Sequence, residues 1–366
     1  MKKGEKLVED SDYKIKEIYK EKKYNKLAKK INSHFLQCWK WGEFKSNFGW
    51  EPHRIIVVNS EDNPVSIGQF LIKNLPLNRS FAYFPMGPSV NFKNKKILNK
   101  VLNRINLYIK NNFKKNVFIR YEMPIIEHKD FNYNESFTNG LGEFNLKKAP
   151  YDIQVRDTRK LKLSDEKTIW EDVFNSNHRR KIRKAFKSDV SIKDIKKKEE
   201  FDKWYQLNKR TAERGGFFIH PYRYYKKYYE KFIIQDISNL YAGYYNNKMV
   251  AGIIVSNYNN ESIYQYGASK RLNKNIYINE ALQWYAIKRS IKRGSDVYDF
   301  WGVAPDEDDR SHPWYGISRF KRKFGGEHIR YIGAYDYPQH KMQYEILIKM
   351  EKIRKQLLKL KKKIIR

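Results

Sequence analysis

The fold is decided by the stretch Val297-Tyr298-Asp299-Phe300-Trp301-Gly302-Val303, together with Pro313-Trp314-Tyr315-Gly316-Ile317 and Arg319-Phe320-Lys321-Arg322-Lys323-Phe324-Gly325-Gly326. The first run is rich in β-branched and aromatic residues and ends in glycine, which predicts a buried strand. Ile317, Phe320 and Phe324 recur at helical spacing, so they predict the apolar face of a short helix that Gly325 stops. We therefore expect a strand, a loop and a helix in this region.

The same order of elements is predicted twice along the chain. The first copy has strands at 54–58, 65–71 and 81–84, a helix at 97–109 and a strand at 117–121; the second has strands at 240–245, 249–257 and 263–268, a helix at 279–292 and a strand at 297–300. This repetition predicts a duplicated α/β unit. We expect a first domain at 1–150, a second domain at 151–326, and a C-terminal segment, 327–366, that packs back on the first domain.

The composition favours a globular protein with an anionic ligand. Hydrophobic residues make up 40% of the chain and aromatic residues 16%, which is enough for packed cores. Lys and Arg number 75 against 41 acidic residues, a net charge of +34 that attracts RNA, nucleotide phosphates or an anionic membrane face. A genome of biased base composition is the alternative explanation for part of this excess, but such bias alone should raise Glu alongside Lys.

The cellular compartment is predicted from cysteine usage and from the N-terminus. Cys38 is the only cysteine, which excludes an intramolecular disulfide and fits a reducing compartment. The segment 1–10 is too charged for the apolar core of a signal peptide, and no run approaches the ~20 apolar residues that span a bilayer. We expect a soluble, cytoplasmic protein.

Several motifs, in their order along the chain, resemble the Fem family, the aminoacyltransferases that extend the side chain of peptidoglycan precursors using aminoacyl-tRNA. They are Gln37-Cys38-Trp39-Lys40-Trp41-Gly42-Glu43-Phe44-Lys45, Tyr83-Phe84-Pro85-Met86-Gly87-Pro88, Asn177-His178-Arg179-Arg180-Lys181-Ile182-Arg183-Lys184-Ala185 and Phe320-Lys321. The resemblance spans about 35–336 and implies an α/β fold of two tandem N-acetyltransferase-like (GNAT) domains with a C-terminal helix. No long heptad segment corresponds to the coiled-coil arm of some members.

The resemblance implies acceptor-binding residues in the first domain. Lys45 matches the family's lysine that contacts precursor phosphate, and Tyr83 matches a tyrosine that lines the acceptor pocket. An acidic residue often follows the tyrosine motif in the family, whereas this chain has Asn91. A carboxylate partner for the acceptor amine is therefore not apparent from the sequence.

Further substrate contacts are implied in the second domain. Tyr224 matches a substrate-lining ring, but His220 stands where several Fem proteins have a phosphate-binding Arg. Either His220 gives a weaker contact or Arg223 substitutes from a shifted position. Tyr264 and Tyr266 are similar to rings that line the family's central channel.

A run of cations opens the second domain. Its members Arg179, Arg180, Lys181, Arg183 and Lys184 are predicted to contact tRNA, with Ile182, Ala185 and Phe186 on the inward helical face. A solvated helix surface is the alternative, because most charge runs are of that kind.

The resemblance assigns catalysis to Lys321, with Phe320 beside it. An amino acid esterified to tRNA is already activated, so we expect no ATP, metal or other cofactor; Lys321 would stabilise the oxyanion. No His–carboxylate pair suggests a general base, so the substrate or water would accept the proton. Metal-ligand histidine spacings and a Walker A motif are absent, and 306–309 (Asp-Glu-Asp-Asp) is predicted to be a solvated acidic turn.

The tail at 341–366 carries ten basic and two acidic residues, with an apolar stripe formed by Ile346, Met350, Ile353, Leu357, Leu360 and Ile364. Such a helix either lies on an anionic membrane or packs on the first domain. The expected partners are aminoacyl-tRNA and an acceptor, UDP-MurNAc-pentapeptide or lipid II, bound by a monomer.

Two other functions stay open from the sequence. A non-catalytic RNA-binding protein would explain the charge but not the ordered motifs. A CoA-dependent acyltransferase would need a glycine-rich loop at 268–275, which has no glycine.

Overall fold

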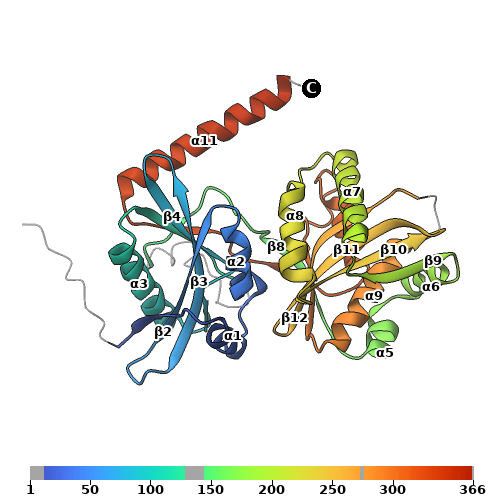
Figure 1. Ribbon diagram of the computed structural model, residues 1–366, viewed down its shortest axis with the longest axis horizontal. Helices are drawn as coiled ribbons and strands as arrows, with labels where there is room; N and C mark the ends of the chain where they lie inside the picture. Colours follow the sequence, from blue (N-terminus) through green and yellow to red (C-terminus); the bar gives the residue numbers. More distant parts are fainter. Residues whose placement is uncertain (1–11, 128–143, 273–275, 365–366) are drawn as a thin grey trace, which may run out of the picture. The chain divides into compact units, whose positions relative to one another are not determined.

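The computed structural model describes residues 12–127, 144–272 and 276–364, with the backbone alone at 352 and 354–364. Two compact units divide the chain: unit 1 comprises Met1–Gln154 with Tyr331–Arg366, and unit 2 comprises Val155–Arg330. Unit 1 is therefore built from both ends of the sequence, and unit 2 is a continuous segment between them (Figure 1).

The described elements of unit 1 are β1 (Lys14–Glu17), α1 (Glu21–Lys30), the 3₁₀ turn η1 (Phe35–Gln37), α2 (Trp39–Ser46), β2 (Trp50–Val58), β3 (Pro64–Leu75), β4 (Arg79–Pro85), β5 (Ser89–Val90), α3 (Lys95–Asn112), β6 (Asn116–Glu122), β7 (Lys147–Lys148), β15 (Tyr335–Pro338) and α11 (Lys341–Ile364).

The described elements of unit 2 are β8 (Asp157–Lys162), α5 (Glu166–Thr168), the π-helical turn η3 (Ile169–Val173), α6 (Ser176–Phe186), β9 (Val190–Ile195), α7 (Lys198–Gly215), α8 (Tyr222–Tyr228), the π-helical turn η4 (Tyr229–Ile233), β10 (Ser238–Tyr245), β11 (Lys248–Tyr258), β12 (Glu261–Ser269), α9 (Ile278–Lys292), β13 (Val297–Gly302), α10 (Tyr315–Arg322) and β14 (Glu327–Arg330).

Each unit contains one mixed sheet with the same central plan. In unit 1 the order is β1-β2-β3-β4-β6-β15-β7, with β5 beside β3; in unit 2 it is β14-β8-β13-β12-β11-β10-β9. An antiparallel meander leads to a strand, a helix follows, and the next strand returns in parallel: β4 with β6, and β12 with β13. This arrangement confirms the predicted repeat of hairpin, strand, helix and strand.

Alternating residues of the central strands pack against helices on opposite faces. In β11, Ile253 belongs to the same core cluster as Leu282 of α9, whereas the Gly252 carbonyl accepts a hydrogen bond from Trp204 Nε1 of α7 at 3.2 Å. A Cβ at Gly252 would lie 2.5 Å from the Trp204 ring, so this close approach requires glycine. The period-2 pattern thus places α7 and α9 on different faces of the unit 2 sheet (Figure 1).

Two sequence predictions about helix faces are wrong. Ile317 is exposed on α10, and the inward positions are Ser318 and Lys321. Phe186, at the end of α6, is also exposed, while Ile182 and Ala185 are buried as expected. A polar group can take an inward position when its hydrogen bonds are satisfied there, and a count of apolar spacing cannot show this.

The last strand of unit 1 is held by a buried ion pair. Arg120 of β6 donates from Nε and Nη2 to the two carboxylate oxygens of Asp336 on β15, both at 2.8 Å. The side chains are 1% and 0% exposed, and Tyr344 of α11 donates its hydroxyl hydrogen to the same carboxylate at 2.9 Å. One network therefore ties the central sheet to both C-terminal elements of the unit.

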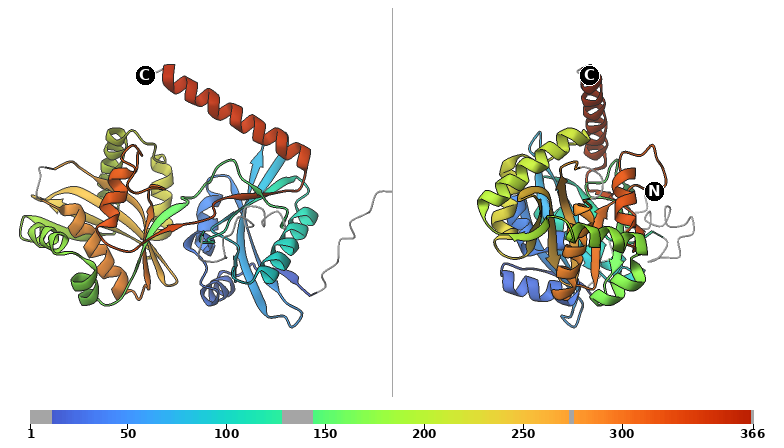
Figure 2. Two further views of the ribbon diagram at one scale, coloured as in Figure 1. Left: turned by 180° about the vertical axis from the view of Figure 1, so that it is seen from behind. Right: turned by 90° about the vertical axis from the view of Figure 1, so that its right-hand side faces the viewer.

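The tail helix has two different faces. Tyr344 is buried with Val117 and Phe118 of β6, and Leu347 and Ile348 pack against this cluster. Met342, Ile346, Met350 and Ile353 are 52–77% exposed, and α11 leaves the sheet after its first turns (Figures 1 and 2). Part of the predicted stripe is therefore exposed; the side chains of Leu357, Leu360 and Ile364 lie outside the described residues. No helix in the described part of the chain is both long and apolar enough to cross a membrane.

Replacement of Asp336 by Ala should destabilise the protein by about 3–5 kcal/mol, because it leaves the Arg120 guanidinium buried without its carboxylate. Urea unfolding followed by circular dichroism measures the change. The exposed pair of Lys147 and Glu345, at 2.8 Å, gives the matched control, and Glu345→Gln should cost under about 1 kcal/mol. Equal effects of the two substitutions would contradict the role given to the buried pair.

Candidate functional site

The central feature of unit 2 is a buried lysine on α10. Lys321 is 4% exposed, and its Nζ donates to the carbonyl oxygens of Trp301 at 3.2 Å and Gly302 at 2.7 Å. An ammonium group has three N–H donors, so these two bonds leave one for a further acceptor.

A bulge in β13 brings both carbonyl groups to Lys321. The pairing of β13 with β8 shifts between Asp299 and Gly302, and Trp301 has φ +59°, which a bulky residue rarely adopts. The Asp299 carboxylate accepts hydrogen bonds from the Trp301 backbone N–H at 2.6 Å and from the Thr158 hydroxyl. These contacts hold the unusual backbone conformation that positions the lysine.

The site lies where two parallel strands separate. β12 and β13 pair only from Glu261–Val297 to Ile263–Asp299, and the ring of the next residue, Tyr264, lies 5.5 Å from Lys321 Nζ. A Cβ at Gly267 would lie only 1.9 Å from the Tyr264 hydroxyl oxygen, so the ring occupies space that a side chain would fill. The Tyr264 ring thus lies beside the amine at the point where the strands separate.

Burial lowers the pKa of Lys321 to about 7, although the negative charges of Asp299 and Glu307 act in the opposite direction. Glu307 is itself buried in an ion pair with Arg159. The prediction of a fully solvated turn at 306–309 is therefore wrong at this residue. With this pKa, Lys321 can carry or release a proton near neutral pH.

Three of the predicted substrate-binding residues of unit 2, His220, Tyr224 and Tyr266, form an aromatic cluster. The His220 and Tyr224 rings stack with centroids 3.8 Å apart, and Tyr266 is hydrogen-bonded to Tyr224. Arg223 is exposed on the first turn of α8. The structure thus brings together His220, Tyr224 and Tyr266 but not Arg223, and Phe320 is half-buried against Phe324.

In unit 1 the predicted acceptor tyrosine is bound to a carboxylate. Tyr83, buried in β4, donates its hydroxyl hydrogen to Glu122, and Gln154 Nε2 donates to the Tyr83 oxygen at 3.0 Å. Glu122 also accepts from the backbone N–H groups of Ile153 and Gln154. Burial and the neighbouring Glu122 raise the pKa of Tyr83 well above its ordinary value. A buried carboxylate that the sequence analysis did not single out thus lies beside Tyr83, at the end of β6.

Lys45 lies against two indole rings. Its Nζ is 5.7 Å from the Trp41 centroid and 5.6 Å from the Trp50 centroid, at the last turn of α2. Burial and the nearby charge of Lys73 lower the pKa of Lys45 to about 8. Trp50 also contacts the Tyr83 ring, with centroids 5.8 Å apart, so Lys45 and Tyr83 belong to one cluster.

The cations of α6 differ in how far they are engaged by the fold. Arg179 Nη1 donates to the carbonyl oxygens of Trp170 and Phe174 at 3.1 and 2.7 Å, so its guanidinium stabilises the end of the π-helical turn η3. Arg180, Arg183 and Lys184 are exposed, and Lys181 lies 5.5 Å from the Tyr277 ring. The exposed members can contact a ligand without breaking bonds that hold the fold.

Sequence reasoning missed Asp299, Glu122 and Lys73. Arg120 and Glu122 are charged residues within a strand of mostly hydrophobic residues, which is the signal that the sequence offers for a buried polar network. Lys73 gave no such signal among 75 basic residues. Only the structure shows that Lys73 is paired across the strands with Trp50, whose ring Lys45 also contacts.

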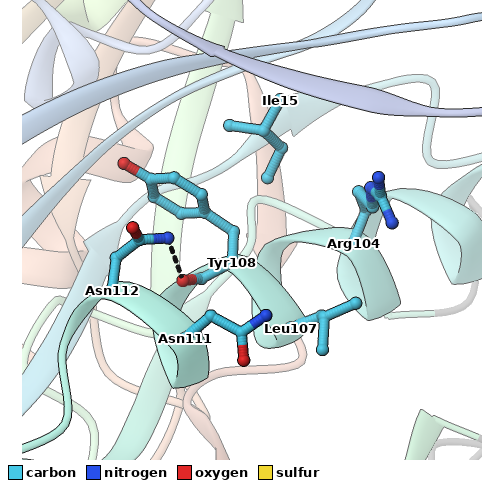
Figure 3. Close-up of a pocket in the computed structure, with 6 residues that line it drawn as sticks. All are labelled: Ile15, Arg104, Leu107, Tyr108, Asn111 and Asn112. Carbon is cyan, nitrogen blue, oxygen red and sulfur yellow. Dashed lines mark hydrogen bonds between the residues drawn. The ribbon is translucent and has the colours of Figure 1, made fainter.

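A separate hollow of about 210 Å³ lies between α3 and β1 of unit 1 (Figure 3). It is lined by Ile15, Arg104, Leu107, Tyr108, Asn111 and Asn112. None of the predicted site residues is among them, so we do not assign this hollow to the candidate site.

Comparison with known proteins gives consistent results for sequence and fold. The FemAB family model matches residues 20–246 and 233–352. The lipid II:glycine glycyltransferase of Staphylococcus aureus (strain USA300) is 23% identical over 411 residues, covering 92% of this chain and 94% of that protein.

Among solved structures, FemX superposes with a TM-score of 0.78 at 20% identity and covers 91% of this chain and 100% of its own. A tandem GNAT protein from the clavulanic acid biosynthesis pathway has a TM-score of 0.52 at 8% identity, with 89% and 98% covered. These likenesses confirm the prediction of an α/β fold with tandem GNAT-like units.

The depressed pKa of Lys321 should make stability depend on pH in a specific direction. Between about pH 7 and pH 10 the unfolded state binds more protons at this residue than the folded state, so raising the pH stabilises the wild type relative to Lys321→Met, by up to about 1.4 kcal/mol per pH unit. Urea unfolding of both proteins across this range measures the difference.

Lys209→Met on α7 gives the control, because Lys209 is exposed and its replacement should produce a difference that hardly varies with pH. If the wild type and Lys321→Met differ by the same amount at pH 7 and pH 10, the lysine is not desolvated as described.

Proposed function

Because the chain belongs to the FemAB family, we propose that it is an aminoacyltransferase that moves an amino acid from aminoacyl-tRNA onto the side-chain amine of the peptidoglycan precursor stem peptide. The activity of the Staphylococcus aureus relative, a lipid II:glycine glycyltransferase, supports this reaction class. The observation that carries the proposal is the buried ammonium of Lys321, held by two backbone carbonyls where β12 and β13 separate.

Aminoacyl transfer forms a C–N bond and breaks the ester C–O bond. The acceptor amine loses a proton, the ester carbonyl oxygen becomes negative in the tetrahedral intermediate, and the tRNA hydroxyl leaves with a proton. Two of the three N–H donors of Lys321 are bound to backbone carbonyls. The third can donate to that oxyanion. In a buried environment such a charged donor stabilises the transition state more than it would in water.

The proton that the leaving oxygen needs has a nearby source. With a pKa of about 7, Lys321 can give a proton to that oxygen and recover one from the acceptor amine or from water. Tyr264, whose ring lies 5.5 Å from Nζ, would help to exclude water from the site. No separate general base is required in this scheme.

We assign donor binding to the cations of α6. Arg180, Lys181, Arg183 and Lys184 present positive charge from one helix, which suits the phosphates of tRNA. Arg179 is the least suited of the predicted set, because its guanidinium already serves three carbonyl groups.

We assign acceptor recognition to Lys45 and Tyr83 in unit 1. A partly buried lysine suits an acceptor phosphate, and the tyrosine is fixed by Glu122. His220, Tyr224, Tyr266 and Arg223 are proposed to contact substrate in unit 2. UDP-MurNAc-pentapeptide and lipid II are the candidate acceptors.

The cytoplasmic location, the monomeric state and peripheral membrane contact stay predictions. The exposed residues Met342, Ile346, Met350 and Ile353 on α11 favour contact with an anionic membrane. Sedimentation with anionic vesicles tests this contact; equal binding by a chain truncated after Glu345, which lacks Ile346, Met350 and Ile353, would reject the role of the tail.

The main experiment incubates the protein with charged tRNAs and each precursor form and identifies the products by mass spectrometry. Lys321→Met should lower kcat by about 100-fold or more, because the oxyanion loses its donor. Lys323→Met, one residue beyond α10, should retain most of the activity if it folds as the wild type does. A folded Lys321→Met enzyme with full activity would remove Lys321 from the mechanism.

The donor-binding assignment predicts a separable defect. Reversing two charges in Arg180→Glu/Lys184→Glu should raise the KM for aminoacyl-tRNA at least about tenfold and flatten its salt dependence, while the KM for the acceptor changes little. The control is Lys209→Glu on α7. This helix packs on one face of the sheet, whereas α6 contacts α9, which packs on the opposite face. A double variant that keeps the wild-type salt dependence would show that α6 does not contact the RNA.

A further inference from the structure

A buried carboxylate is linked to Lys321 through a single residue of β13. Asp299 is 0% exposed, and its Oδ1 accepts a hydrogen bond from the Trp301 backbone N–H at 2.6 Å. The carbonyl oxygen of Trp301 accepts a hydrogen bond from Lys321 Nζ at 3.2 Å. Trp301 is therefore bound by the carboxylate at its N–H and by the ammonium at its carbonyl group.

The backbone between these two groups needs outside support. Trp301 has φ +59°, which costs a bulky side chain conformational energy, and the pairing of β13 with β8 is irregular here. The Thr158 hydroxyl of β8 donates to the same Oδ1 of Asp299, which fixes the orientation of the carboxylate from the neighbouring strand. Without this acceptor the Trp301 backbone could relax, and its carbonyl group would move away from Lys321.

The second oxygen of Asp299 takes part in a group of charges. Among the described residues, Oδ2 has no hydrogen-bond partner, and it forms an ion pair with Lys160 Nζ at 3.7 Å. Lys160 also pairs with Glu261 of β12. One ammonium thus serves two carboxylates, and Lys321 can balance the excess negative charge of this group.

The charges that face Lys321 differ in how far they are already neutralised. Asp299 and Glu307 both favour its protonated form, against the burial that lowers its pKa to about 7. Arg159 binds both carboxylate oxygens of Glu307, and burial raises the pKa of Tyr264 to about 12, so this ring is uncharged. Burial also raises the pKa of Asp299, whereas its ion pair and hydrogen bonds lower it.

We propose that Asp299 is a positioning residue for Lys321, which holds the ammonium in place through the Trp301 backbone and supplies a negative charge that keeps it protonated. The two oxygens divide these tasks, because Oδ1 is bound to the β13 backbone and to Thr158 while Oδ2 faces Lys160. This inference rests on the proposed function for the reaction that Lys321 performs, but not for the coupling of the two residues.

The first test follows the protonation of Lys321 through protein stability. Urea unfolding of the full-length wild type and of Lys321→Met from about pH 5 to about pH 10 gives the contribution of Lys321, because the other titrating groups are common to both proteins. The same comparison is then made in the Asp299→Asn background. The amide keeps an oxygen acceptor for Trp301 and Thr158 but carries no charge.

Loss of the charge should make the folded protein release the Lys321 proton at a lower pH. The unfolded state then binds more protons than the folded state from that lower pH upward. The pH-dependent gain of the lysine over methionine should therefore begin about one pH unit or more lower in the Asp299→Asn background. Asp296→Asn, at an exposed carboxylate just before β13, should leave this onset in place. An onset that Asp299→Asn does not move overturns the proposal.

Transfer kinetics test the positioning role. In Asp299→Asn the fall of kcat at high pH should begin at a lower pH than in the wild type, with little change in the KM of either substrate. Asp299→Ala also removes the acceptor for the Trp301 N–H, so it should lower kcat at every pH. Circular dichroism and thermal unfolding establish which variants are folded, and equal kcat profiles of the folded Ala and Asn variants would overturn the positioning role.

The two experiments separate this inference from the proposed function. If the wild type transfers no amino acid but the onset still moves in Asp299→Asn, the proposed function fails and the coupling of Asp299 to Lys321 stands. If transfer depends on Lys321 while the onset stays where it is, the inference alone fails.

Discussion

The separation of β12 from β13 is the constraint on which the candidate active site depends. The two parallel strands share hydrogen bonds only at their beginnings, and a bulge then turns the backbone of β13 at Trp301. A regular ladder would have used the carbonyl groups of Trp301 and Gly302 within the sheet. Because the ladder is interrupted, these groups can accept hydrogen bonds from Lys321, and a lysine becomes stable in a buried position.

Lysines that are buried or partly buried beside aromatic rings occur in both units, and their partners differ in a way that suits different tasks. Two carbonyl acceptors hold Lys321 in one position beside the Tyr264 ring, and burial lowers its pKa to about 7. Lys45 lies beside indoles and another cation, Lys73. The first arrangement suits proton and oxyanion chemistry, whereas the second suits a permanently anionic ligand.

The regular elements were predictable because their patterns are local. The strands at 54–58 and 240–245 and the helices at 97–109 and 279–292 all lie within observed elements, since alternation and helical spacing reflect which side of an element is buried. The errors occurred where tertiary contacts override spacing. Ile317 is exposed because Ser318 and Lys321 occupy the inward side of α10. Glu307 is buried because Arg159 neutralises its charge.

The sequence by itself determined the order of strands and helices, the excess of positive charge and the resemblance to the Fem family. Only the tertiary structure decided which of the many cations are buried and what they touch. Lys321, Lys45 and Lys73 are chemically alike in the sequence, and their differences arise from contacts with residues distant along the chain or across a strand. The physical reason is that desolvation and neighbouring charges set the properties of an ammonium group, and both are consequences of folding.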